Sequence, residues 1–404
     1  ALEKNFDAVG MVDLGNMMGA FKFVYEVEKA NGNIKKKYQE FLDKKQKAEE
    51  EGTEFEEIEP RKKELIPIIG CEFYISDRPE KKQFTKDDPD RRTHIVLLAK
   101  NMKGYKNLTK LSSIGYVNGF YFGVPRISKE MISEYKEDLI ALTAGTLGDI
   151  PSTILEFGEQ KGEEVFKWWK ESFQDDFYVQ IQNHEVEEEE HLNDVLLEFA
   201  EKYETKILAQ NETFYTEKSD AHIQDILYCI KDGEKLSSPV GKGFGKRRGL
   251  PTHEFYIKNE DELKQTFRQF PDAFEAYTEF LAKFEPYTLK RDVLLPEFGI
   301  PEEFLSEEDQ LDGGKRGENA YLRFLTYEGA AKKYPEITDE IKDRLDFELA
   351  VIANTGYPGY FLIVQDFCAE ARNMGVWVGP GRGSAAGSAV AYCTGITNVD
   401  PIKY

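Results

Sequence analysis

The first half of the chain alternates short, mostly apolar runs with longer stretches whose apolar residues recur at helical spacing. Several of the short runs are apolar at consecutive positions, so both faces of each run would be buried. Strands of this kind are usually covered by helices on both sides, as in a parallel α/β sheet or barrel. The predicted strands are Ala8–Val12, Leu65–Ile69, His94–Leu98, Leu139–Leu142, Phe177–Ile181 and Lys206–Ala209.

Charged stretches interrupt this pattern. The block of residues 31–63 combines high charge density with weak apolar periodicity. It predicts an exposed helical insertion, with a binding role as the alternative. Glu187–Glu190 is interpreted as the solvated start of a helix. The glycine-rich stretch 241–248 carries several cations, and contact with a nucleic-acid backbone is one interpretation of it. These cations are Lys242, Lys246, Arg247 and Arg248.

Residues 291–301 predict a connection between two domains, because they contain two prolines and no helical periodicity. The first domain would comprise residues 1–290 and the second residues 291–404. Neither end of the chain resembles a natural terminus, so we expect a segment of a longer protein.

Two helices are predicted within the second domain. Thr338 precedes two acidic residues and then apolar residues at helical spacing, so it should cap a helix that ends near Gly356. The next helix is expected from about Tyr360 to Asn373, with Gly375 closing it. Val376–Val378 then predicts a short buried strand.

Residues 379–388 form a glycine-rich loop before a short helix of small residues, Ala389–Tyr392. Glycines at positions 379, 381, 383 and 387 expose the backbone amides to phosphate oxygens and permit positive φ angles. Ser384 is expected to cap the helix, whose positive end faces the loop, and Arg382 supplies a planar cation. The pattern predicts a polyphosphate site; close packing of helix and sheet is the alternative.

Two familiar phosphate-binding patterns do not describe this loop. A Walker A loop requires a Gly-Lys pair, which the loop lacks. The Rossmann fingerprint requires G-x-G-x-x-G, whereas Gly381, Gly383 and Gly387 are spaced as G-x-G-x-x-x-G.

The loop and its flanks resemble the palm of the family C replicative DNA polymerases, the alpha subunits of bacterial DNA polymerase III. The similar segments are Gly356–Phe367, Val378–Ser388, Val390–Tyr392 and Ile396–Pro401. Further upstream, the chain resembles the N-terminal polymerase-and-histidinol-phosphatase (PHP) domain of that family. Those segments are Asp13–Ala20, Pro67–Glu72, Leu97–Asn101, Gly104–Leu108 and Pro125–Ile127. The resemblance implies an α/β fold, with a PHP-type distorted (β/α) barrel followed by part of a polymerase-beta-like nucleotidyltransferase palm.

In that family the glycine-serine loop binds the triphosphate of the incoming nucleotide. The resemblance therefore implies phosphate-binding roles for Gly381, Arg382, Gly383, Ser384, Gly387 and Ser388. Attack of a primer 3′-hydroxyl on the α-phosphate also requires two Mg²⁺ ions held by paired carboxylates. The family's aspartate pair follows the loop, so no catalytic residue is expected before Tyr404 and the segment alone should be inactive.

The resemblance also implies a degenerate PHP metal centre. Three positions that hold metal ligands in the family carry other residues here, namely Leu14, Thr146 and Phe214. The vestigial ligand positions are Glu72, His94 and Glu212, the last in place of an aspartate. A trinuclear centre needs more oxygen and imidazole donors than these. We therefore expect a structural PHP domain with neither bound metal nor hydrolase activity.

Composition narrows the classes of function. The chain has 53 Lys and Arg against 75 Asp and Glu, a net charge of −22. This excludes binding of nucleic acid through bulk positive charge but leaves room for a local basic groove. No apolar run is long enough for a membrane helix, and no signal-peptide pattern opens the chain. The four cysteines form no C-x-x-C pair, which fits a reducing cytoplasm.

Three hypotheses on function remain. The first is a segment of a DNA-directed DNA polymerase, whose partners would be primed template DNA, dNTPs, and replisome subunits such as a proofreading exonuclease and a sliding clamp. The second is a metal-dependent phosphoesterase, which the replaced ligands disfavour. The third is a non-catalytic PHP scaffold that docks a proofreading exonuclease, and it is compatible with the first. The retained triphosphate loop favours the first.

Overall fold

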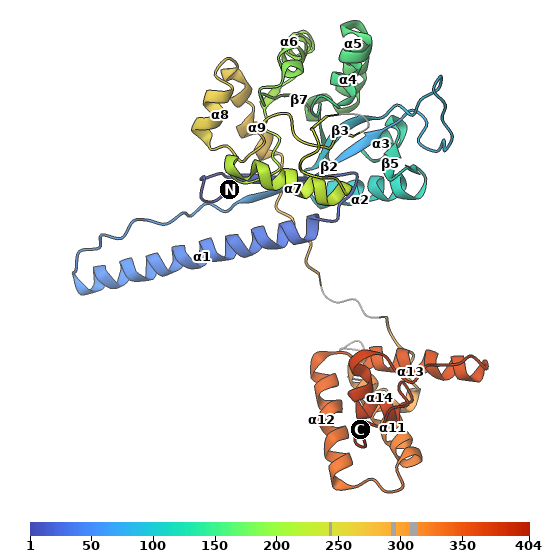
Figure 1. Ribbon diagram of the computed structural model, residues 1–404. Helices are drawn as coiled ribbons and strands as arrows, with labels where there is room; N and C mark the ends of the chain where they lie inside the picture. The colour runs from blue at the N-terminus through green and yellow to red at the C-terminus, as the bar shows by residue number, and fades with distance from the viewer. Residues whose placement is uncertain (242–244, 292–295, 308–313) are drawn as a thin grey trace. The chain divides into compact units, whose positions relative to one another are not determined.

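The computed structural model describes residues 1–241, 245–291, 296–307 and 314–404. Lys242 and part of the predicted connection, residues 292–295, therefore lie outside the described residues. The chain divides into two compact units, Ala1–Lys290 and Arg291–Tyr404, which are drawn in Figure 1 and are described separately below.

The first unit is built on a mixed sheet whose strand order is β4-β5-β2-β3-β6-β7-β8, with β1 also paired to β2. All six predicted strands form. The strands are β1 (Ala8–Leu14), β2 (Ile66–Ile75), β3 (Thr93–Ala99), β4 (Phe120–Tyr121), β5 (Val124–Ile127), β6 (Leu139–Leu142), β7 (Phe177–Ile181) and β8 (Ile207–Ala209).

The expectation of a parallel sheet is wrong at β3, which runs antiparallel to both β2 and β6. The other pairs formed among the six predicted strands are parallel: β1 with β2, β6 with β7 and β7 with β8. A parallel neighbour usually needs a crossover helix. Residues 76–92, which join β2 to β3, contain no helix, so β3 returns in the opposite direction.

Both faces of the sheet are buried, as the continuous apolar runs predicted. Ile95 and Leu97 of β3 enter one core, which includes Phe166 and Trp169, while Val96 and Leu98 enter the other. This division follows the two-residue period of a strand. The helices that contribute to the first core are α2 (Met102–Val117), α3 (Lys129–Tyr135), α4 (Asp149–Phe157), α5 (Glu159–Phe173) and α6 (Glu187–Lys202). On the second face, α9 (Tyr277–Ala282) supplies Phe280.

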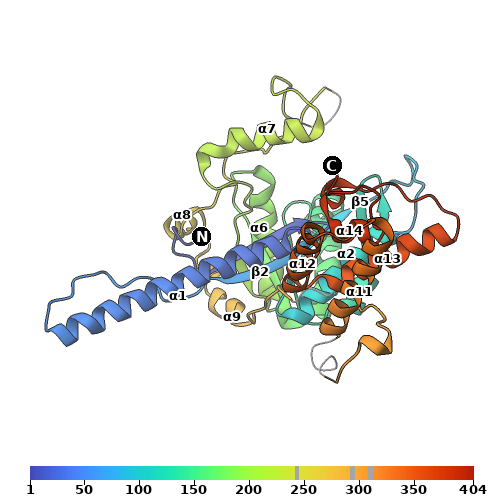
Figure 2. The same cartoon turned by 90° about the horizontal axis from the view of Figure 1, so that it is seen from below.

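The charged insertion is helical for only part of its length. Helix α1 (Ala20–Glu51) carries the chain away from the sheet and ends at Gly52, whose φ of 65° only glycine adopts easily. Residues 53–65 then return along it without helical structure, as Figures 1 and 2 show. Phe55 packs its ring edge-on against Phe41, at 5.2 Å between ring centroids.

The remaining elements of the first unit follow β8. They are η2 (Lys218–Asp220), α7 (Ala221–Asp232), α8 (Glu260–Thr266) and η3 (Pro271–Phe274), while η1 (Gln174–Asp176) precedes β7. In the basic stretch, Arg247 is buried and its Nη2 atom lies 2.8 Å from Asp225 Oδ2. Its Nε–H also donates to the Ser238 carbonyl at 3.0 Å. Arg247 therefore has an internal role, contrary to its interpretation as a nucleic-acid contact.

All the regular elements in the described part of the second unit are helices. Its elements are η4 (Glu302–Phe304), α11 (Lys315–Lys333), α12 (Asp339–Thr355), α13 (Pro358–Asn373), η5 (Gly383–Gly387) and α14 (Ala389–Cys393). They enclose a core that includes Leu345, Leu362 and Val390. The predicted ends of α12 are confirmed, because the Thr338 hydroxyl accepts from the Ile341 amide and Gly356 follows in the left-handed conformation.

Two predictions in this unit need correction. Helix α13 begins at Pro358 and not near Tyr360, because proline fits the first turn of a helix, where its missing N–H costs nothing. Val376–Val378 does not form a buried strand, and Trp377 is 98% exposed. A strand needs a partner for its backbone groups, and the described part of this unit contains no strand to pair with.

Candidate functional site

The first half of the glycine loop is held in an unusual backbone conformation. Gly381 has φ 147° and Gly383 has φ 58°, and both values disfavour residues with a Cβ atom. A Cβ at position 381 would also lie 2.7 Å from Thr397 Oγ1. Thr397 is fully buried, and its hydroxyl donates to the Pro380 carbonyl at 2.6 Å. Glycine is therefore required where the loop passes over Thr397.

The side chains of Arg382 and Ser384 extend from this half of the loop and are exposed. Within the described part of the chain, neither side chain makes a hydrogen bond or an ion pair. A guanidinium and a hydroxyl held on a short backbone turn can bind anionic oxygens without first breaking internal contacts. These two groups have the chemistry that the sequence predicted for a phosphate site.

The second half of the loop is tied to the protein. Ser388, and not Ser384, caps α14: its Oγ accepts from the Ala391 amide at 3.1 Å. The prediction for Ser384 fails because residues 383–387 form a 3₁₀ turn, which places Ser384 one turn before the helix. Ser388 Oγ also donates to Glu348 Oε2 at 2.7 Å.

The carboxylate of Glu348, a residue of α12, lies at the N-terminus of α14. Its Oε1 atom accepts from the Ala389 amide and its Oε2 atom accepts from the Val390 amide, each at 3.1 Å. Arg344, one turn earlier in α12, donates Nε–H to Glu348 at 2.6 Å and Nη2–H to the Gly387 carbonyl at 2.8 Å. The amides at the helix start are thus satisfied by a carboxylate of the chain itself, so they do not offer the expected phosphate contacts.

The charge of Glu348 is stabilised where it lies. Burial acts to raise the pKa of Glu348, but the hydrogen bonds from Ser388, from the two amides and from Arg344 outweigh it and lower that pKa. Sequence reasoning did not find Glu348, because it lies 40 residues before Ser388 in the chain and only the packing of α12 against α14 brings them together.

The first unit brings together the vestigial metal positions. Glu72 on β2 and His94 on β3 are near neighbours across an antiparallel pair, and Glu72 Oε1 lies 2.6 Å from His94 Nδ1. Glu212 follows β8. Burial raises the pKa of Glu212, the charge of Glu72 raises it further, and His184 and His94 oppose the shift. The three positions therefore lie within electrostatic range of one another.

His184, which follows β7, was not predicted to take part. Its Nε2 atom accepts from the backbone N–H of Glu212 at 3.0 Å, so the proton must be on Nδ1. Nδ1 lies 2.7 Å from Glu189 Oε1 and donates to it. Glu189 belongs to the acidic run that was expected to be solvated, yet it is only 7% exposed, because it binds the ring and the backbone amide of His184.

The replaced ligand positions offer no compensating donors. Leu14 and Phe214 are partly exposed apolar side chains, and the Phe214 ring lies against Phe255 at 5.8 Å between centroids. Thr146 lies in the loop between β6 and α4. Among the residues that the structure describes, no three His, Cys, Asp or Glu side chains are arranged to hold a metal ion.

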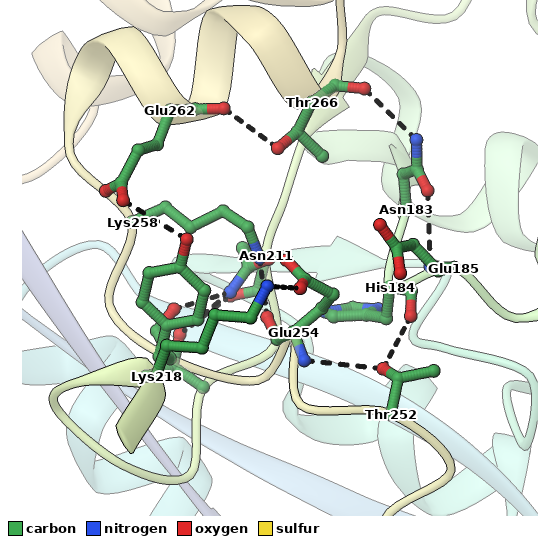
Figure 3. Close-up of polar contacts among 12 residues, drawn as sticks. Asn183, His184, Glu185, Asn211, Lys218, Thr252, Glu254, Lys258, Glu262 and Thr266 are labelled. Carbon is green, nitrogen blue, oxygen red and sulfur yellow. Dashed lines mark hydrogen bonds and ion pairs between the residues drawn. The ribbon is translucent and has the colours of Figure 1, made fainter. Parts of the chain in front are cut away.

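Residues 252–258, which we call the strap, form polar contacts with the loops that follow β7 and β8 (Figure 3). The Thr252 hydroxyl donates to the His184 carbonyl at 2.6 Å. The Lys258 ammonium donates to Asn211 Oδ1 at 2.8 Å and lies 3.2 Å from Glu254 Oε2. Burial lowers the pKa of Lys258, and the contacts with Glu254 oppose this shift. The vestigial centre thus rests on a network of internal polar contacts.

Comparison with known families supports two different assignments along the chain. The sequence model of the PHP domain matches residues 1–184, and that of the bacterial DNA polymerase III alpha NTPase domain matches residues 320–404. The first match agrees with the α/β sheet and its covering helices, so the α/β class and the PHP-type fold of the first unit are confirmed. No helix among the described residues is long and apolar enough to span a membrane.

Three curated relatives, each named DNA polymerase III subunit alpha, align along 99% or more of this chain. The relative from Borreliella burgdorferi is 35% identical over 404 residues, which cover 99% of this chain and 30% of the relative. Those from Campylobacter jejuni and Aquifex aeolicus are 32% and 34% identical, and each match covers 100% of this chain and 32% of the relative. The chain therefore spans about a third of the length of the relatives it matches.

Proposed function

Because the chain belongs to the family of bacterial DNA polymerase III alpha subunits, we propose that it acts as part of a replicative DNA polymerase. The reaction is template-directed transfer of a nucleotide to a primer 3′-hydroxyl, carried out by the longer polypeptide. Primed template DNA, dNTPs and replisome subunits, including a proofreading exonuclease and a sliding clamp, are the partners. The cytoplasm is the compartment, in agreement with four buried, unpaired cysteines.

Within this function, residues 379–388 bind the triphosphate of the incoming dNTP. The observation that carries the proposal is the exposed pair Arg382 and Ser384 on a loop that internal contacts hold in place. Gly381 and Gly383 give their backbone the required turn, and Arg382 binds phosphate oxygens with its planar fork. Gly387 and Ser388 form the anchored end of the loop, since both bind groups of α12.

Two Mg²⁺ ions would supply charge neutralisation and activation of the primer hydroxyl. The described loop does not fit them, because it presents a guanidinium and hydroxyls, and the Glu348 carboxylate at its end already accepts four hydrogen bonds. As the family resemblance implies, we propose that the metal-binding carboxylates follow Tyr404 in the longer polypeptide.

The PHP unit serves as a structural platform and a docking scaffold for a proofreading exonuclease, without metal of its own. The metal ligands that this unit lacks support this proposal. Three ligand positions carry Leu14, Thr146 and Phe214, and Nε2 of His184 already accepts a hydrogen bond from a backbone amide. The same observations disfavour a metal-dependent phosphoesterase.

Replacement of Arg382 by Ala in the full-length polymerase tests the triphosphate assignment. We expect kcat/KM for dNTP to fall by an amount that corresponds to about 2 to 4 kcal/mol, the usual effect of losing one preorganised donor. Binding of the primed template should not change. Arg323→Ala is the matched control, because Arg323 is an exposed arginine of α11 paired with Asp346. A loss below about threefold for Arg382→Ala would contradict the assignment.

A further inference from the structure

The loop that we assign to the triphosphate is attached to α12 at one end through two side chains. Arg344 and Glu348 are one helical turn apart, so they point the same way from α12. Arg344 holds the carbonyl of Gly387, and Glu348 holds the hydroxyl of Ser388 and the next two amides. Four consecutive residues, the last two of the loop and the first two of α14, are therefore fixed by one ion pair.

Each oxygen of Glu348 accepts two hydrogen bonds. Oε1 receives the Arg344 Nε–H and the Ala389 amide, while Oε2 receives the Ser388 hydroxyl and the Val390 amide. The side chain is 12% exposed and that of Arg344 is 41% exposed. A nearly buried carboxylate with no accepting capacity to spare does not contact substrate, and its negative charge would repel a triphosphate.

We infer that Glu348 and Arg344 are positioning residues that set the place of the triphosphate loop and thereby the affinity for dNTP. This inference rests on the proposed function of residues 379–388. The ion pair acts through the backbone: it fixes Gly387 and Ser388, and the 3₁₀ turn of residues 383–387 connects these to Arg382 and Ser384. Loss of the anchor would let the turn move and would misplace the groups that bind phosphate.

The same geometry determines which part of the loop takes the triphosphate. A phosphate cannot share the Ala389 and Val390 amides with the Glu348 carboxylate, because the two anions would compete for the same donors. The triphosphate therefore binds at Gly381–Ser384, and α14 contributes no direct contact.

Glu348→Gln is the informative variant. The side chain keeps its shape, but an amide offers an accepting oxygen on one side only and presents N–H groups on the other. One backbone amide of α14 would then face a donor. In the full-length polymerase, we expect KM for dATP opposite template thymine to rise about tenfold, the effect of losing one charge-assisted hydrogen bond, while kcat stays within about twofold. Glu328→Gln is the control, since Glu328 forms an exposed pair with Lys332 one turn along α11.

A double-mutant cycle that combines Glu348→Gln with Arg344→Ala tests whether the two residues act together on the loop. Arg344 reaches Gly387 from the position in which Glu348 holds it. The double variant should therefore raise KM for dATP by no more than about the larger of the two single effects. Additive effects would show that the residues act independently, and would overturn the paired role.

A purely structural role would give a different result. If Glu348 only stabilised the fold, Glu348→Gln would lower the fraction of active enzyme found by active-site titration and would leave KM for dATP unchanged. That outcome would overturn the inference. The triphosphate assignment is checked by Arg382→Ala in the same assay: no effect there contradicts the proposed function, whereas an effect of Arg382→Ala without one of Glu348→Gln contradicts this inference alone.

Discussion

The Lys258 ammonium lies 2.8 Å from Oδ1 of Asn211, the residue directly before the vestigial ligand Glu212. The Lys258 side chain is 2% exposed, so this contact and the ion pair with Glu254 replace almost all of its hydration. A buried cation thus holds the loop after β8 against the strap of residues 252–258 (Figure 3).

Removal of this cation should destabilise the first unit. In Lys258→Met, the carboxylate of Glu254 stays buried and loses one of its two cationic partners, and Asn211 loses a donor. Breaking a buried pair in this way typically costs about 3 to 5 kcal/mol, and because Lys218 still compensates Glu254 we expect about 3 kcal/mol. Chemical denaturation of the 404-residue chain measures this change.

Lys264→Met is the control for that experiment. Lys264 also pairs with a glutamate four residues earlier, but its side chain is 60% exposed. An exposed pair of this kind contributes about 0.5 kcal/mol or less. Equal effects of the two substitutions would show that burial of Lys258 does not matter to stability.

The first unit should bind no metal cluster. Three family ligand positions carry Leu14, Thr146 and Phe214, and the imidazole of His184 is oriented by Glu189 and the Glu212 amide. Elemental analysis of the purified chain after dialysis against Zn²⁺ and Mn²⁺ is expected to find less than one ion per chain. Two or more tightly bound ions per chain would contradict the prediction that this unit has a purely structural role.

Much of the fold was predictable because it depends on local patterns. The strands β3, β6 and β7 are apolar at every or nearly every position, and burial of both faces follows from that alone. The ends of α12 were predictable from Thr338 and Gly356, because capping depends on one or two residues. The direction of β3 was not predictable, because it depends on how residues 76–92 lead the chain back to the sheet.

The candidate site was predictable only in its exposed half. Glycine spacing and Arg382 identified the loop, because flexible backbone and charge are visible in sequence. The anchoring by Glu348 was not visible, since it joins residues 40 positions apart through packing of two helices. The prediction of a buried strand at Val376–Val378 was wrong for a different reason. An apolar run predicts burial, but the described part of the second unit contains no strand with which this run could pair.

Protection of the α14 amides should depend on pH through Glu348. Hydrogen bonds hold the pKa of Glu348 below its ordinary value of 4.5, despite burial, which acts in the other direction. The stabilisation is therefore complete above about pH 5 and is lost as the pH falls through this lowered pKa. Hydrogen exchange should show falling protection factors at Ala389 and Val390 in that range.

The Ile341 amide provides the internal control, because its cap acceptor is the hydroxyl of Thr338, which does not titrate. Glu348→Gln should remove the pH dependence at Ala389 and Val390. Protection that stays constant from pH 6 to pH 3 in the parent protein would contradict the contact between Glu348 and these amides.

Two glycines of the loop should respond differently to replacement by alanine. At Gly381, a Cβ would meet the buried Thr397 hydroxyl at 2.7 Å and the φ of 147° would be strained. At Gly379, a Cβ would meet no described atom within 4 Å and φ is not in the left-handed range. Strain of this kind costs about 1 to 3 kcal/mol, and it would be relieved by local opening of the loop.

Trypsin reports that opening directly, because Arg382 is exposed within the loop. When opening is fast relative to cleavage, the cleavage rate follows the population of the open form. We expect cleavage after Arg382 to be about 5 to 150 times faster in Gly381→Ala than in the parent chain, the ratio that about 1 to 3 kcal/mol produces. Gly379→Ala should be cleaved at the parental rate. If both variants are cleaved equally fast, the contact between residue 381 and Thr397 does not hold the loop closed.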